Sequence, residues 1–126
     1  MNIRYILDGQ PIPLQRPRFS NGHVWDCQSK EKLMVSTYLK YLHKNLPLLI
    51  GPLELHISFF LKHKVKSCWH FNRPDLDNLI KFYMDCANGV LYEDDKQVVK
   101  IIATKVYAQS PHTEIYVNEI DNILRT

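Results

Sequence analysis

The chain has 126 residues, about the size of one ordinary domain, and its 45% hydrophobic content excludes an intrinsically disordered chain. Its net charge is +3. Its three cysteines are widely spaced, so we expect neither a disulfide framework nor a zinc site. It lacks an apolar segment long enough for a membrane span and the pattern of a signal peptide, so we expect one cytoplasmic domain over residues 1–126.

The N-terminal part of the chain is predicted to hold a strand and a long loop. Apolar residues alternate over residues 2–7, which is typical of a strand, and Asp8-Gly9 is a turn signal that ends it. Three prolines predict an extended loop over residues 10–21, and residues 22–25 can form a short strand.

The next segment is predicted to form a helix and a strand. Ser29 can cap the helix, residues 30–45 continue it, and Pro47 ends it. Residues 53–61 alternate between two sets of side chains, which predicts a strand with one well-buried face. The apolar residues at helical spacing in the helix are Met34, Tyr38, Tyr41, Leu42 and Leu46.

The second half of the chain is predicted to add one helix and two strands. After a basic loop over residues 62–71, a helix is predicted over residues 76–87, and Asn88-Gly89 stops it. Residues 97–107 and 114–120 each predict a strand. The order strand, helix, strand, helix, strand, strand indicates a single compact α/β (α+β) domain with a mixed sheet and two main helices.

The charges are distributed unevenly along the chain. Residues 1–74 carry eleven Lys and Arg against four Asp and Glu, whereas residues 75–99 carry two against six. A basic body with one acidic segment suits a protein that binds a polyanion and holds a cation among carboxylates. Chance clustering on a mixed surface explains the same distribution equally well.

The first candidate site is the acidic start of the second predicted helix. Asp75 and Asp77 lie where a helix leaves backbone N–H groups unpaired, so one of them could serve as a cap. Two carboxylates two residues apart, followed by Asn78, exceed what capping requires. Lys81 can share a helical face with Asp77, either as an ordinary ion pair or with its ammonium beside a bound phosphate.

The second candidate site is the acidic run Glu93-Asp94-Asp95, which precedes the Val-rich strand. Taken alone, such a run is equally typical of a solvated turn. If the fold brings it near Asp75 and Asp77, the carboxylates together suit Mg²⁺ or Mn²⁺, which can polarise a phosphate and activate water. The six histidines are scattered, and no Ser–His or Cys–His nucleophile pattern is evident.

These motifs resemble the signature of the RusA family of crossover-junction endodeoxyribonucleases. That family has Asp-x-Asp-Asn-x-x-Lys, a helix, and then a glycine and a turn ending Asp-Asp-x-Gln. The chain has the first motif at residues 75–81 and the second at residues 89–98. The segment Pro-Leu-Gln-Arg-Pro-Arg-Phe at residues 13–19 is similar to the early Arg-Pro-Arg of the family.

The resemblance implies a RusA-like fold and a nuclease that resolves Holliday junctions, four-way branched DNA, by paired symmetric nicks. It implies Mg²⁺ or Mn²⁺ without a nucleotide cofactor, and a homodimer that is bacterial or phage-encoded and associated with the nucleoid. It places catalytic, metal-binding acids at Asp75, Asp77 and Asp95, with Asp94 as the alternative third acid, and an essential lysine at Lys81. Candidate interface residues, which core packing explains equally well, are Leu46, Leu48, Leu49, Ile50 and Phe60.

Residues before position 75 are candidates for DNA contact. Their positive side chains can position DNA through its phosphates, and Trp69 could stack on an exposed base or lie in the core or an interface. Two alternatives remain open: a RusA-like protein that binds branched DNA without cutting it, and a metal nuclease that acts on flaps or forks. The basic candidates are Arg16, Arg18, Lys62, Lys64, Lys66 and Arg73.

Overall fold

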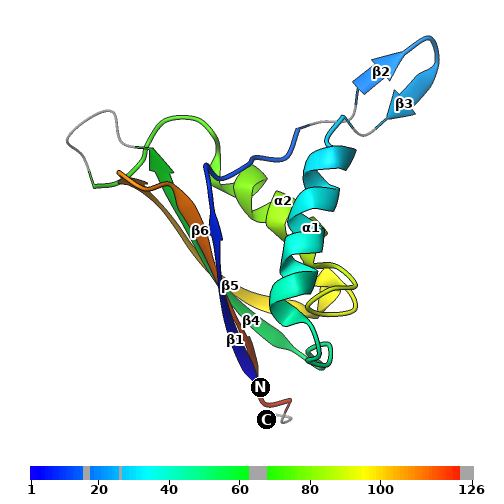
Figure 1. The fold of residues 1–126 in the computed structure, drawn as a ribbon, viewed down its shortest axis with the longest axis vertical. Helices are drawn as coiled ribbons and strands as arrows, with labels where there is room; N and C mark the ends of the chain where they lie inside the picture. The colour runs from blue at the N-terminus through cyan, green and yellow to red at the C-terminus, as the bar shows by residue number, and fades with distance from the viewer. Residues whose placement is uncertain (16–17, 26, 63–67, 123–126) are drawn as a thin grey trace, which may run out of the picture.

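The computed structural model describes residues 1–15, 18–25, 27–62 and 68–122. Within these residues the chain forms a four-stranded sheet, a two-stranded hairpin, two α-helices and one 3₁₀ turn (Figure 1). In chain order the elements are β1 (Asn2–Asp8), β2 (Arg18–Ser20), β3 (His23–Trp25), α1 (Ser29–His43), β4 (Leu53–Lys62), α2 (Leu76–Ala87), η1 (Asp95–Gln97), β5 (Val98–Ala108) and β6 (His112–Glu119).

The strands of the main sheet are ordered β1-β6-β4-β5, with β1 and β5 at its edges. β6 runs antiparallel to both β1 and β4, whereas β4 and β5 run parallel. Parallel neighbours need a crossover connection, and the crossover from β4 to β5 contains α2, which therefore packs across the sheet. The mixed sheet with two helices confirms the predicted α+β fold class.

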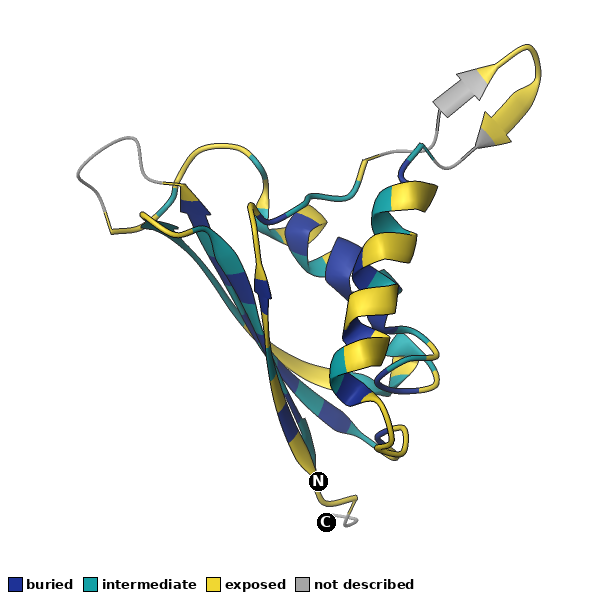
Figure 2. Cartoon of the chain, viewed as in Figure 1, coloured by how far each residue is buried: buried dark blue, intermediate teal, exposed yellow. Residues whose placement is uncertain are grey.

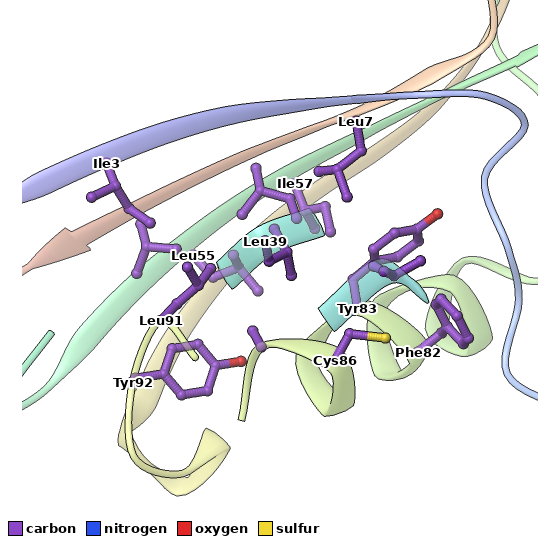
Figure 3. Packing of buried hydrophobic residues seen from close by; sticks show 14 of the residues in the cluster. Ile3, Leu7, Leu39, Leu55, Ile57, Phe82, Tyr83, Cys86, Leu91 and Tyr92 are labelled. Atoms are coloured by element: carbon purple, nitrogen blue, oxygen red, sulfur yellow. The ribbon is translucent and has the colours of Figure 1, made fainter. Parts of the chain in front are cut away.

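Both helices cover the same face of the sheet, and the hydrophobic core fills the space between them and the strands (Figures 2 and 3). β4 shows this most clearly, because its odd-numbered residues from Leu53 to Leu61 are all buried and its even-numbered residues are less so. Truncating such a buried leucine to alanine costs about 2–5 kcal/mol. The alternation that predicted this strand is therefore the alternation that builds the core.

The residues that α1 buries differ from the apolar residues on which its prediction from the sequence depended. Val35, Leu39 and His43 are buried, whereas Met34 and Tyr38 are exposed. His43 can lie inside because its ring bonds to the Tyr5 hydroxyl at 2.6 Å and to the Pro47 carbonyl at 2.8 Å. A hydrogen-bonded histidine thus takes an interior position that a search for apolar residues passes over.

The start of α1 also differs from the prediction. The capping position belongs to Gln28, one residue before Ser29, and its side chain makes no capping hydrogen bond to the helix. The buried Gln28 amide instead accepts from the Gln15 N–H at 2.7 Å and donates to the Pro13 carbonyl at 2.8 Å. The N-terminal loop is therefore tied to the beginning of α1.

The β2–β3 hairpin extends away from the sheet and the helices (Figure 1). Its second strand confirms the short strand predicted at residues 22–25, but β2 lies inside the segment predicted as a loop. Asn21 and Gly22 form the turn with positive φ angles of 50° and 77°. Asn-Gly is the residue pair that such tight hairpin turns favour, so the sequence did contain the signal.

α2 has the bounds that the sequence predicted, and it presents Leu79, Tyr83 and Ala87 to the core. Phe82 and Cys86 are also buried. Among the described residues, neither helix is long and apolar enough to cross a membrane. Cys68 and Cys86 are free thiols.

Candidate active site

Asp75 occupies the capping position of α2 without acting as a cap. Its backbone is extended, with φ −69° and ψ 142°, but its carboxylate makes no capping hydrogen bond. Asp77 lies in the first turn, where its Oδ1 accepts from the backbone N–H of Asn78 at 3.0 Å. Both side chains are exposed. Capping, which could have explained Asp75 from the sequence, therefore does not account for its carboxylate.

The two aspartates of the acidic turn have different partners. Asp94 caps η1: its Oδ2 accepts from the Lys96 N–H at 3.0 Å, and the Gln97 side chain bonds back to the Asp94 N–H at 3.2 Å. Asp95 follows as the first residue of η1, and its carboxylate contacts the Lys81 ammonium at 3.3 Å. Of the two, Asp95 is the one that reaches the helix carrying Asp75 and Asp77.

Gln97 holds the acidic turn in place. Its side-chain oxygen accepts from the backbone N–H groups of Glu93 and Asp94, and its NH₂ donates to the carbonyls of Leu49 and Gly51. These four bonds, between 3.0 and 3.2 Å, tie the turn to the loop before β4. The position of Asp95 therefore rests on a rigid backbone rather than on a solvated loop.

Lys81 links α2 to this turn. Its Nζ lies 3.0 Å from Oδ1 of Asp85 and 3.3 Å from Oδ2 of Asp95. The hydrogen bond to Asp85, reinforced by the one to Asp95, raises the pKa of the Lys81 ammonium above its ordinary value against the opposing effect of partial burial. Lys81 is consequently a fixed positive charge among carboxylates.

Sequence reasoning missed Asp85. It lies one helical turn beyond Lys81, and it also contacts Lys32 of α1 with the two charged atoms 3.8 Å apart. The signal was present, because positions 77, 81 and 85 follow each other at intervals of four and share one helical face.

The fold does not bring all the predicted acids together. Asp95 contacts α2 at Lys81, and Asp75 lies six residues before Lys81, which corresponds to about 9 Å along the helix axis. Among the residues that the structure describes, no group of three or more His, Cys, Asp or Glu side chains is placed to hold a metal ion. The donor chemistry nevertheless fits a hard divalent cation, since carboxylate oxygens are the ligands that Mg²⁺ and Mn²⁺ prefer.

A cleft of about 600 Å³ lies beside Asp75. Arg73, Asp75 and Asn78 line one wall, and the N-terminal loop forms the other. This loop is docked on α2, because the Leu14 N–H bonds to the Asn78 carbonyl at 2.9 Å and the Ile12 N–H to the Tyr83 hydroxyl at 3.0 Å. Volumes of this order are usual for sites that take small-molecule-sized groups.

Arg73 connects this cleft with a neighbouring one of about 640 Å³, which Lys62 also lines. Both basic side chains are exposed, as expected for candidates that contact DNA. The remaining basic candidates are not described by the structure: Arg16, Lys64 and Lys66 lie outside the described residues, as does the side chain of Arg18.

Trp69 lies on the sheet edge, 62% exposed, with its backbone bridged to Val106 of β5. A core position is therefore excluded for this side chain. Phe71, two residues further along, is 78% exposed and was not singled out from the sequence. The two aromatic residues precede the start of α2 and lie in the same segment as Arg73.

Comparisons with known proteins agree with the sequence motifs. Residues 8–118 match the family model described as Endodeoxyribonuclease RusA. The chain is 35% identical over 95 residues to a crossover junction endodeoxyribonuclease rusA of Lactococcus phage r1t, covering 72% of this chain and 69% of the relative. It is also 26% identical over 137 residues to the uncharacterized protein YqaN of Bacillus subtilis, covering 94% of this chain and 96% of that protein.

Proposed function

Because the chain belongs to the RusA family of endodeoxyribonucleases, we propose that it resolves Holliday junctions by paired, symmetric hydrolysis of phosphodiester bonds. The observation that carries the proposal is the contact of Lys81 with Asp95, which joins the two separate motifs of the family at 3.3 Å. Its place of action would be the cytoplasm, at the nucleoid.

The acids are assigned to a divalent metal, Mg²⁺ or Mn²⁺, with Asp75, Asp77 and Asp95 as the residues that would hold it. Such an ion, when bound, polarises a phosphate and lowers the pKa of a coordinated water. Asp95 is preferred to Asp94 as the third acid, because the Asp94 carboxylate already caps η1.

Lys81 supplies a permanent positive charge to the same region. Since its contacts with Asp85 and Asp95 raise its pKa, the ammonium stays protonated at neutral pH. Beside a DNA phosphate, it would offset the negative charge of the oxygens and keep Asp95 oriented.

DNA would approach along the two clefts that share Arg73. Arg73 and Lys62 are exposed there and would bind backbone phosphates, which fix position without reading sequence. Trp69, and with it the exposed Phe71 two residues further along, is assigned to stacking on bases that the branch point leaves exposed. The other basic candidates, Arg16, Arg18, Lys64 and Lys66, are also assigned to phosphate contact on the ground of their charge alone.

A homodimer is part of the proposal, because resolution takes two nicks and each chain carries one set of candidate catalytic acids. Of the apolar residues considered for the interface, Leu46, Leu48 and Ile50 are exposed, whereas Leu49 is buried in the core. Phe60 stacks on His112 with ring centroids 4.1 Å apart, so its place in the sheet already explains it.

The experiment that tests this function compares cleavage of a synthetic four-way junction, a flap and a linear duplex, each with and without Mg²⁺. We expect paired nicks at symmetric positions of the junction in the presence of Mg²⁺, and little cutting of the duplex. Cutting of flaps alone would favour a nuclease for other branched DNA, and tight junction binding without any cutting would favour a binding protein.

A further inference from the structure

Lys105 of β5 forms hydrogen bonds with the backbone just before the start of α2. Its Nζ donates to the main-chain carbonyl of Asn72 at 2.7 Å and to that of Pro74 at 2.6 Å. These two carbonyls belong to the residues on either side of Arg73, and the second of them, Pro74, directly precedes Asp75. One ammonium thus grips the chain at both ends of the tripeptide that leads into the candidate active site.

Placing the Lys105 ammonium here is unfavourable unless its hydrogen bonds to the backbone carbonyls offset the cost. An ammonium near the N-terminus of a helix faces the positive end of the helix dipole, and a lysine fixed at its tip loses the freedom of a long side chain. Among the described residues, Lys105 forms no ion pair with a carboxylate that would offset this cost. Its two hydrogen bonds to carbonyls are therefore the interactions that account for its position.

The rest of this segment is attached to β5 independently of the Lys105 side chain. The His70 N–H bonds to the Lys105 carbonyl at 3.1 Å, and the Tyr107 N–H bonds to the Cys68 carbonyl at 3.0 Å. The Asn72 side chain donates to the Tyr107 hydroxyl at 3.0 Å. Without the ammonium, the segment would stay docked up to Asn72, and the stretch that loses support would be Arg73–Asp75.

We propose that Lys105 is a positioning residue for the nuclease reaction. By holding the carbonyls of Asn72 and Pro74, it fixes the direction in which the chain presents Asp75 and Arg73 to the cleft, and it acts on cleavage through Asp75 rather than through contact with DNA. The inference rests on the proposed role of Asp75 and adds a residue that lies outside both acidic motifs.

The test compares Lys105→Met and Lys105→Arg with the control Lys100→Met. Lys100 is an exposed lysine of the same strand that pairs with Glu54 at 3.3 Å, away from the start of α2. We expect K105M to slow single-turnover junction cleavage about 10- to 100-fold, as misplacement of a reacting group does, while K105R recovers much of the rate. Junction affinity, measured without divalent metal, should fall much less than the rate, because Lys105 itself contacts no phosphate and only the placement of Arg73 is loosened.

A second measurement reports on the backbone itself. Amide hydrogen exchange should become faster at residues 75–79 in K105M but not in K100M, with slow exchange preserved in β4. Lys105→Gln, which keeps a donor without the charge, replaces K105M if that variant does not fold.

The outcomes separate this inference from the proposed function. Wild-type cleavage by K105M beside an inactive Asp75→Asn variant would overturn the positioning role and leave the role of Asp75 intact. A loss of junction affinity as large as the loss of rate would also overturn it, because the effect of Lys105 would then lie in DNA binding rather than in the placement of Asp75. Wild-type cleavage by D75N would instead remove Asp75 from the reaction, and with it the route by which Lys105 acts.

Discussion

Lys81 and Asp95 join the two acidic segments of the chain, with Nζ and Oδ2 3.3 Å apart. Lys81 comes from α2 and Asp95 from the start of η1, and 14 positions separate them in the sequence. The contact depends on Gln97, whose four hydrogen bonds fix the turn against the loop before β4. The neighbouring Asp94 is held in that turn as a cap, and this difference leads to the first prediction.

Asp95→Asn should abolish junction cleavage, whereas Asp94→Asn should remain active and stable. Asparagine caps helices about as well as aspartate, so D94N keeps the bond to the Lys96 N–H. Asp94→Ala should lower the free energy of unfolding by about 1 kcal/mol, since it removes the cap. Cleavage rates and urea denaturation measure the two effects. An inactive D94N beside an active D95N would show that the third acid is Asp94.

Activity should require a divalent metal that Asp75 and Asp77 help to hold. Asp75→Asn and Asp77→Asn keep the size of the side chain but remove the charge that a cation needs, so each should stop cleavage and leave junction binding intact. Cleavage assays with a Mg²⁺ titration and an electrophoretic binding assay in chelator measure both properties. Asp121→Asn, an exposed acid far along the chain, is the control. Full cleavage in excess chelator would contradict the prediction.

Junction binding should weaken steeply with salt, because basic residues release counterions when they bind phosphates. Replacing Arg73, which lines both clefts, by Gln should reduce the slope of log affinity against log salt by about one. The matched control is Arg4→Gln, since Arg4 is an exposed arginine on β1 that pairs with Glu114 at 3.6 Å. Equal slopes for wild type and R73Q would exclude Arg73 from phosphate contact.

The parts of the fold that depend on local signals could be predicted from the sequence. α2 begins after a proline and ends before Asn88-Gly89, and Gly89 has the positive φ of 74° that glycine adopts readily. β4 was predicted because its alternation is strict. Asp75 and Asp77 stood out because they lie at the start of a predicted helix, whereas Asp95, with Asp94 as its alternative, was named through the resemblance to the RusA family.

What depends on distant contacts could not be predicted. The interior face of α1 includes His43, whose burial depends in part on a hydrogen bond to Tyr5 of β1, 38 positions away. The grip of Lys105 on Asn72 and Pro74 joins β5 to a segment 31 to 33 positions earlier. Neither residue type nor spacing distinguishes Lys105 from Lys100 on the same strand. Such pairings follow from the register of the sheet, which the sequence alone leaves open.

The protein should form a two-fold dimer through the exposed apolar residues beside the acidic turn. Leu48, Ile50 and Val99 line a cleft of about 520 Å³ together with Lys96 and Gln97, and Ile50 is 73% exposed. Large exposed aliphatic side chains that gather on one surface mark interaction sites. A two-fold interface here would relate the two turns that carry Asp95 by symmetry, which gives the matched pair of sites that paired nicking requires.

Sedimentation of wild type and Ile50→Glu at micromolar concentration tests the dimer and its location. We expect a wild-type dimer, and an I50E monomer that has lost paired nicking, because a buried unpaired carboxylate opposes association. Met34→Glu, on the exposed face of α1, is the matched control and should stay dimeric. A monomeric M34E beside a dimeric I50E would move the interface to α1. A strict wild-type monomer, both free and on junction DNA, would refute paired nicking and favour a nuclease that acts on flaps.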